Sequence, residues 1–120
     1  MSKIITMEDI KNFSQLSGDE NPVHLDAEYA KNTIFKDIIA HGLYVASLIS
    51  AVIANKMPGA GSIYLGQDLK FLKPAYVGDE IVAEVSVLDF PKSNFAKLKT
   101  VVTNQRKEIV IEGTALVKLS

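Results

Sequence analysis

The spacing of hydrophobic residues changes once along the chain, from a helical period before about residue 57 to an alternating period after it. The first helical pattern begins at Thr6, whose hydroxyl can accept a hydrogen bond from an unpaired backbone amide. Glu8 and Asp9 follow at the positive end of the helix dipole, and Gly18 is typical of a helix end. The pattern therefore predicts a short helix between Thr6 and Gly18.

A loop is predicted over residues 18–25. Asn21 precedes Pro22, and a residue before proline is displaced from the helical region of backbone conformations. Asp26 is expected to cap a second short helix that runs to about Ala30. Residues 32–39 show no clear period and are expected to be irregular.

Residues 42–56 carry hydrophobic side chains in almost every direction around a helix, so this helix is expected to be enclosed by the rest of the fold. Its apolar members are Leu43, Val45, Ala46, Leu48, Ile49, Ala51, Val52, Ile53 and Ala54. The most apolar part would be only about 18 Å long, which is too short to cross a bilayer. No membrane partner is expected.

Alternating hydrophobic residues predict strands over residues 63–71, 81–88, 95–104 and 108–118, with a bulge or a close backbone approach at Gly66. An enclosed helix followed by four strands predicts a curved, mostly antiparallel sheet wrapped around one long helix. This is an α+β arrangement of the hot-dog type, expected as a single domain over residues 1–120. The strand faces that point away from the enclosed helix also carry many apolar residues, which indicates that a second copy covers them in a homodimer.

Composition narrows the choice of partners. The chain has 120 residues with 48% hydrophobic and 22% charged side chains, which suits a globular domain. Its net charge is −1, and every basic residue except Arg106 is a lysine, spread along the sequence rather than clustered. Nucleic acid is therefore not expected as a partner.

The absence of cysteine excludes disulfides, thiolate metal sites and a cysteine nucleophile, and two histidines alone make a zinc site improbable.

The first ten residues include Glu8 and Asp9, where a secretory signal would need a continuous apolar stretch. The expected location is therefore the cytoplasm.

Asp19 and His24 are the main candidates for chemistry, because they lie five positions apart on one short loop. Each has a simpler explanation: Asp19 could form a turn with Asn21, and His24 could be a half-buried structural side chain. Together, an acid and an imidazole on a rigid loop are suited to hold and polarise one water molecule. The residues leave open which of the two removes a proton from it.

The segment from Phe13 to His24, with Ala30 six residues further on, resembles the hydratase 2 motif of the MaoC-like (R)-specific enoyl-CoA hydratases. The resemblance continues through residues 39–42, 58–67 and 71–80, and so covers nearly the whole chain. It implies addition of water to a trans-2-enoyl-CoA to give the (R)-3-hydroxyacyl-CoA, without a metal or redox cofactor. The implied partner is an acyl-CoA thioester. Asp19 and His24 correspond to the catalytic pair of the family, and Asn21 is expected to brace the loop or Asp19 and not to transfer a proton.

Three further residues are candidates for a place in the site. Gly42 begins the long helix, where a free amide could stabilise negative charge on the thioester oxygen, so we expect it to be the oxyanion donor. The resemblance implies that Ser50 lies in the same pocket, near Asp19 or the thioester. His41 is expected to make a structural hydrogen bond at the helix start.

Two other functions fit the same residues. A (3R)-hydroxyacyl-ACP dehydratase would run the reverse reaction on a carrier-protein thioester. A non-catalytic acyl-CoA-binding subunit would keep the fold, although it would not need both Asp19 and His24. A thioesterase is a further enzymatic option, and it would differ by releasing free CoA.

Overall fold

The structure is a computed structural model of the chain, and residues 1–119 are described. The helices and strands occur in the order β1 (Ser2–Ile4), α1 (Met7–Ser17), α2 (Pro22–Leu25), α3 (Ala27–Lys31), α4 (Gly42–Asn55), β2 (Ile63–Gln67), β3 (Lys70–Phe71), β4 (Glu80–Asp89), β5 (Phe95–Thr103) and β6 (Ile109–Lys118). The helical front half and strand-rich back half expected from the sequence are both present.

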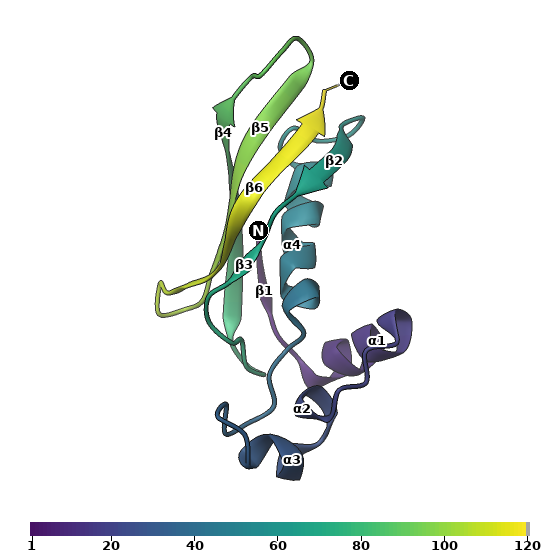
Figure 1. Cartoon of the computed structure of the whole chain (residues 1–120), viewed down its shortest axis with the longest axis vertical. Helices are drawn as coiled ribbons and strands as arrows, with labels where there is room; N and C mark the ends of the chain where they lie inside the picture. The colour runs from purple at the N-terminus through teal and green to yellow at the C-terminus, as the bar shows by residue number, and fades with distance from the viewer. Residues whose placement is uncertain (120) are drawn as a thin grey trace.

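All strands belong to one antiparallel sheet with the order β1-β4-β5-β6-β2, and β3 also pairs with β6. The sheet curls along α4, while α1, α2 and α3 gather at one end of the molecule (Figure 1). This is the hot-dog arrangement predicted from the sequence. No helix in the described part of the chain is long and apolar enough to cross a membrane.

The core lies between α4 and the concave face of the sheet. Helix α4 contributes Val45, Ile49 and Ile53, each no more than 2% exposed. The strands contribute Ile81, Leu98, Val102, Ile111 and Val117. Burying one such side chain stabilises a fold by about 1.5–3 kcal/mol, so this contact fixes the position of α4 and of the residues at its first turn.

The expectation that α4 is enclosed on all sides is wrong for a single chain. Leu43 is 63% exposed, and Ser47, Ser50 and Ala54 are exposed along the same side of the helix. The physical reason is geometric: one curled sheet covers one side of a helix, and the first three helices are too far toward one end to cover the other. The uncovered side of α4, formed by these four residues, faces away from the core.

The helix boundaries follow their local signals with one exception. The Thr6 hydroxyl accepts from the Asp9 amide at 3.1 Å, and Gly18 closes α1 in the left-handed conformation with φ 83°. Asp26 caps α3 as expected. The predicted loop over 18–25 is wrong in its second half, because Pro22 begins the short helix α2. Proline is well tolerated at a first helical position, where no amide donor is needed.

Two strands also differ from the prediction. The interval 63–71 is divided into β2 and β3 at Asp68, whose backbone oxygen lies where a side chain on Gly113 of β6 would be. Only glycine allows this close approach, and the sequence pattern did not reveal it. Strand β1 pairs with β4 and was missed because three residues are too few to show a period. The bulge predicted at Gly66 is confirmed by a shift in register between Tyr64 and Gly66.

Candidate active site

The loop between α1 and α2 is built from short-range hydrogen bonds. Asp19 Oδ1 accepts from the Asn21 amide at 3.2 Å, and Asn21 Oδ1 accepts from the Val23 amide at 3.2 Å. One carboxylate oxygen of Asp19 is therefore engaged in the turn, while Oδ2 has no hydrogen-bond partner among residues 1–119. Asn21 caps α2 and does not line the nearby cavity.

His24 lies on α2 and is 8% exposed. Its Nδ1 atom lies 2.7 Å from the backbone oxygen of Ile39, which can only accept a hydrogen bond. Nδ1 therefore carries the proton in the neutral ring, and the lone pair is on Nε2. This contact assigns the tautomer and leaves Nε2 as the atom able to accept a proton from a ligand.

His41 precedes the first residue of α4 and is 2% exposed. Its ring stacks on the ring of His24, with centroids 3.9 Å apart and planes inclined by 26°. His41 Nε2 lies 3.1 Å from the backbone oxygen of Asp19 and 3.0 Å from the hydroxyl of Ser14. Burial lowers the pKa of His41, so the neutral ring is favoured.

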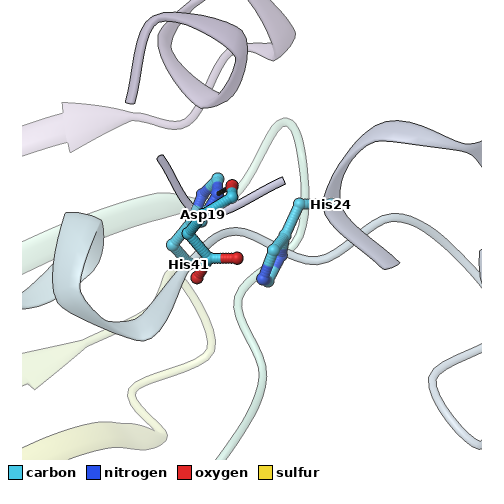
Figure 2. Close-up of side chains that lie close together, drawn as sticks. All are labelled: Asp19, His24 and His41. Atoms are coloured by element: carbon cyan, nitrogen blue, oxygen red, sulfur yellow. Dashed lines mark hydrogen bonds between the residues drawn. The ribbon is translucent and has the colours of Figure 1, made fainter. Parts of the chain in front are cut away.

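Asp19 and His24, which are five residues apart, meet His41 from the start of α4 in one place (Figure 2). Their possible ligand atoms all lie within 4.8 Å of one another. A metal ion is a poor fit, because it should lie in the plane of each ligating imidazole at about 2.0–2.1 Å from nitrogen. Two stacked, nearly parallel rings cannot both meet that condition at one ion. The cluster is better suited to hold a small polar molecule such as water.

A cavity of about 660 Å³ opens beside this cluster. Asp19, His24, His41 and Gly42 are among its lining residues. The remaining lining is mainly apolar and includes Phe13, Ile39, Leu43, Val45, Phe71, Leu72, Val110 and Ile111. Its size and apolar character suit a small organic ligand with a hydrophobic portion.

Gly42 provides the first amide of α4. No protein oxygen among residues 1–119 accepts a hydrogen bond from this amide, as is usual for the first amides of a helix. A Cβ atom at position 42 would lie 2.5 Å from the ring of Phe71, so glycine is required while that ring stays in place. Gly42 therefore presents a donor to the cavity next to Phe71.

The structure brings together Asp19, His24 and Gly42 around the cavity, whereas Ser50 is placed elsewhere. Ser50 is exposed on the uncovered side of α4 and does not line the cavity of the single chain. It lies eight residues beyond Gly42, which corresponds to about 12 Å along a helix.

Sequence reasoning missed the contacts made by Ser14, Ile39 and Phe71. Ser14 is a buried polar residue on α1, and its partner His41 is 27 positions away in the sequence, so local patterns give no signal for this contact. Ile39 contributes a backbone oxygen, which side-chain patterns cannot reveal. His41 does make a hydrogen bond, but it reaches back to the loop at Asp19 instead of capping α4.

Comparison with known proteins identifies related sequences and folds. Residues 2–110 match the family described as "MaoC like domain". The chain is 43% identical over 118 residues to an (R)-specific enoyl-CoA hydratase of Rhodospirillum rubrum, covering 98% of this chain and 81% of that protein. It is also 43% identical over 115 residues to a mitochondrial 3-hydroxyacyl-[acyl-carrier-protein] dehydratase of Solanum lycopersicum, covering 93% and 68%.

The fold is similarly close to a solved structure. The (R)-hydratase from A. caviae involved in PHA biosynthesis superimposes with a TM-score of 0.96 at 41% sequence identity. The match covers 100% of this chain and 92% of that one.

Proposed function

The chain belongs to the MaoC-like domain family, and from this membership we propose that it is an (R)-specific enoyl-CoA hydratase, a hydro-lyase. It adds water to a trans-2-enoyl-CoA and forms the (R)-3-hydroxyacyl-CoA. The observation that carries this proposal is the meeting of the Asp19 carboxylate, the His24 imidazole and the Gly42 amide at one cavity. Hydration of an unsaturated thioester needs a base, a group that orients the water and a donor to the thioester oxygen, and these three groups can provide those roles.

Asp19 and His24 would hold the attacking water between them. Oδ2 of Asp19 and Nε2 of His24 are the acceptors that their other contacts leave available. As the water oxygen bonds to Cβ, His24 Nε2 takes one of its protons, and the imidazolium is stabilised by the adjacent carboxylate. Return of that proton to Cα completes the addition and restores the neutral ring. Because the water and the proton both reach the same face of the double bond, the addition is syn.

The Gly42 amide would stabilise the intermediate state of this addition. Bond formation at Cβ moves negative charge onto the thioester oxygen, and a donor fixed at a helix start can meet it without rearranging. Loss of one donor of this kind typically costs about 3 kcal/mol of barrier. The reaction is redox-neutral, and each proton it moves has a protein group to carry it.

The activity is tested by mixing the protein with crotonyl-CoA and following the loss of enoyl-thioester absorbance. The product is then scored for R or S configuration, and free thiol is measured in parallel. We expect the R product and no released CoA. An S product would exclude the proposed stereochemistry, and released thiol would instead identify a thioesterase.

A second candidate is the reverse reaction on a carrier-protein thioester. The similarity to the Solanum lycopersicum dehydratase favours it, since that identity is as high as the identity to the hydratase. The same three groups would remove water in that direction. Comparing kcat/KM for CoA and carrier-protein substrates of equal chain length distinguishes the two functions.

We further propose that two copies of the chain form a homodimer. Two surfaces of the single chain are left exposed: the uncovered side of α4, and the sheet edge formed by β2, where Ile63, Tyr64 and Leu65 are 53%, 39% and 49% exposed. A second copy is the partner that would cover both the helix and the unpaired edge strand. Ser50 would then lie at the interface, and its role in binding would depend on the partner. Sedimentation at micromolar concentration tests this state.

We also propose that the protein is located in the cytoplasm. Fractionation of cells that express the chain tests it.

A further inference from the structure

We propose that His41 is a positioning residue that sets the orientation of both Asp19 and His24 for the reaction. This inference rests on the proposed hydration and deepens it. His41 is in contact with each member of the pair, through a hydrogen bond to one and ring stacking on the other. No other side chain among residues 1–119 makes both kinds of contact.

The first contact fixes the loop that carries Asp19. The backbone oxygen of Asp19 can only accept, so His41 Nε2 must hold a proton and donate it across 3.1 Å. The hydroxyl of Ser14 lies 3.0 Å from the same nitrogen and links α1 to this contact. His41 thus ties the start of α4 to the residue whose carboxylate must face the water.

The second contact fixes the plane of the His24 ring. The bond from Nδ1 to Ile39 holds one atom of that ring but permits rotation about the bond. The stacked ring of His41, at 3.9 Å between centroids, removes this freedom on one face. The direction of the His24 Nε2 lone pair is therefore set by Ile39 and His41 together.

The protonation state expected of His41 supports this role. Burial lowers the pKa of His41, and the charged or titratable groups that face it are Asp19 from the loop and His24 from α2. When the His41 ring is neutral, His24 can accept a proton during turnover. A charged His41 imidazolium would repel the positive charge that forms on His24.

An ordinary packing role explains these observations less well. His41 Nδ1 is buried and has no hydrogen-bond partner among the described residues, which destabilises the folded chain. An apolar side chain of similar volume would fill the same space without that penalty. A histidine at this position is explained if its Nε2 donor is needed to hold Asp19 and its ring face is needed to hold His24.

Separate variants test the two contacts. In His41→Gln the side-chain amide can still donate to Asp19, but the stacking ring is lost. In His41→Phe the ring is kept, but the donor is lost. We expect each variant to lower kcat for crotonyl-CoA hydration at least tenfold and to change KM less than threefold. We also expect the acid limb of the kcat/KM pH profile to shift in His41→Gln, since the environment of His24 changes.

Wild-type kcat and an unchanged pH profile in both folded variants would overturn the inference. Should either variant fail to fold, Ser14→Ala provides a milder change, with an expected severalfold loss of kcat at constant KM; unchanged kcat there would count against the inference.

Nitrogen NMR of the histidine rings separates this inference from the proposed function. We expect His41 to be protonated at Nε2 and His24 at Nδ1 in the wild type, and the His24 ring resonances to broaden in His41→Gln as that ring gains freedom about its bond to Ile39. If the wild type hydrates no thioester, the proposed function fails, and the NMR result still decides whether His41 orients His24. The opposite tautomer at His41 would overturn the inference even in an active enzyme.

Discussion

The Nδ1 atom of His24 lies 2.7 Å from the backbone oxygen of Ile39, and this single contact decides which nitrogen of the ring can act as a base. It also connects α2 to the segment that leads into α4. The role of the ring can therefore be tested without disturbing its anchor.

His24→Asn is the first test. Asparagine can place an amide donor near the position of Nδ1 and keep the bond to Ile39, but it has no basic nitrogen at the position of Nε2. We expect crotonyl-CoA hydration to fall by about 10²–10⁴-fold. Far-UV circular dichroism and the thermal midpoint should stay close to wild type. Hydration at the wild-type rate by a folded variant would remove His24 from the mechanism.

Asp19→Asn tests the carboxylate, with Glu20→Gln as its matched control. The side-chain amide oxygen that this change introduces could still accept from the backbone amide of Asn21, so the turn should be retained. Glu20 is exposed and does not line the cavity. We expect a loss of about 10²–10⁴-fold in kcat for the first change and almost none for the second. Equal rates for the two variants would contradict the assignment.

Gly42→Ala tests the space in front of the donor amide. The new Cβ would lie 2.5 Å from the Phe71 ring, which is 54% exposed and able to move. We expect a folded protein with raised KM and lowered kcat, because the displaced ring and the methyl group both occupy substrate space. The second change Phe71→Leu should recover part of the loss. Steady-state kinetics of the single and double variants provide this comparison.

Stability at acidic pH should depend on Glu108. Lys73, with Asn104 and Arg106, holds the pKa of Glu108 at about 2, below the ordinary value of 4.5. A carboxyl group with a lowered pKa in the folded state stabilises it above the unfolded value, and this contribution is lost as the pH falls from 4.5 toward 2. The thermal midpoint of wild type should therefore fall more steeply than that of Glu108→Gln over this range. Parallel curves would contradict the expectation.

The dimer should depend on the exposed edge of β2. Leu65→Glu places a charge where a second copy is expected to pair, and we expect sedimentation to shift from dimer to monomer. Leu16→Glu is the control, since Leu16 is 86% exposed on α1 at the far end of the chain's fold. A monomeric wild type, or equal behaviour of both variants, would exclude this interface.

Local signals were enough to predict most of the fold. The caps at Thr6 and Asp26 and the helix end at Gly18 are each produced by contacts within a few residues, so the sequence displays them directly. The same reasoning failed at Pro22. Proline disfavours a helical conformation at the residue before it, whereas the predicted loop also included residues 22–25, which form α2. It also failed at Asp68, because the break there depends on Gly113 from a distant strand.

The candidate site was predictable only in part for the same reason. Asp19 and His24 are five residues apart and could be paired from their spacing. The stacking of His41 on His24 joins residues from different elements, and the backbone oxygen of Ile39 has no side-chain signature. Ser50 is exposed because the sheet curls around only one side of α4. The spacing of hydrophobic residues along the sequence does not reveal how far a sheet curls.

The turn from Asp19 to Val23 has a consequence for how the protein responds to its substrate. Two of its hydrogen bonds join residues only two positions apart, and a third joins Asp19 to His41 of the same chain, so the loop can adopt its shape before anything enters the cavity. Dipoles that are already aligned need little reorganisation when charge develops nearby. Free and occupied forms should therefore superimpose closely here, and any induced fit should be confined to mobile rings such as Phe71.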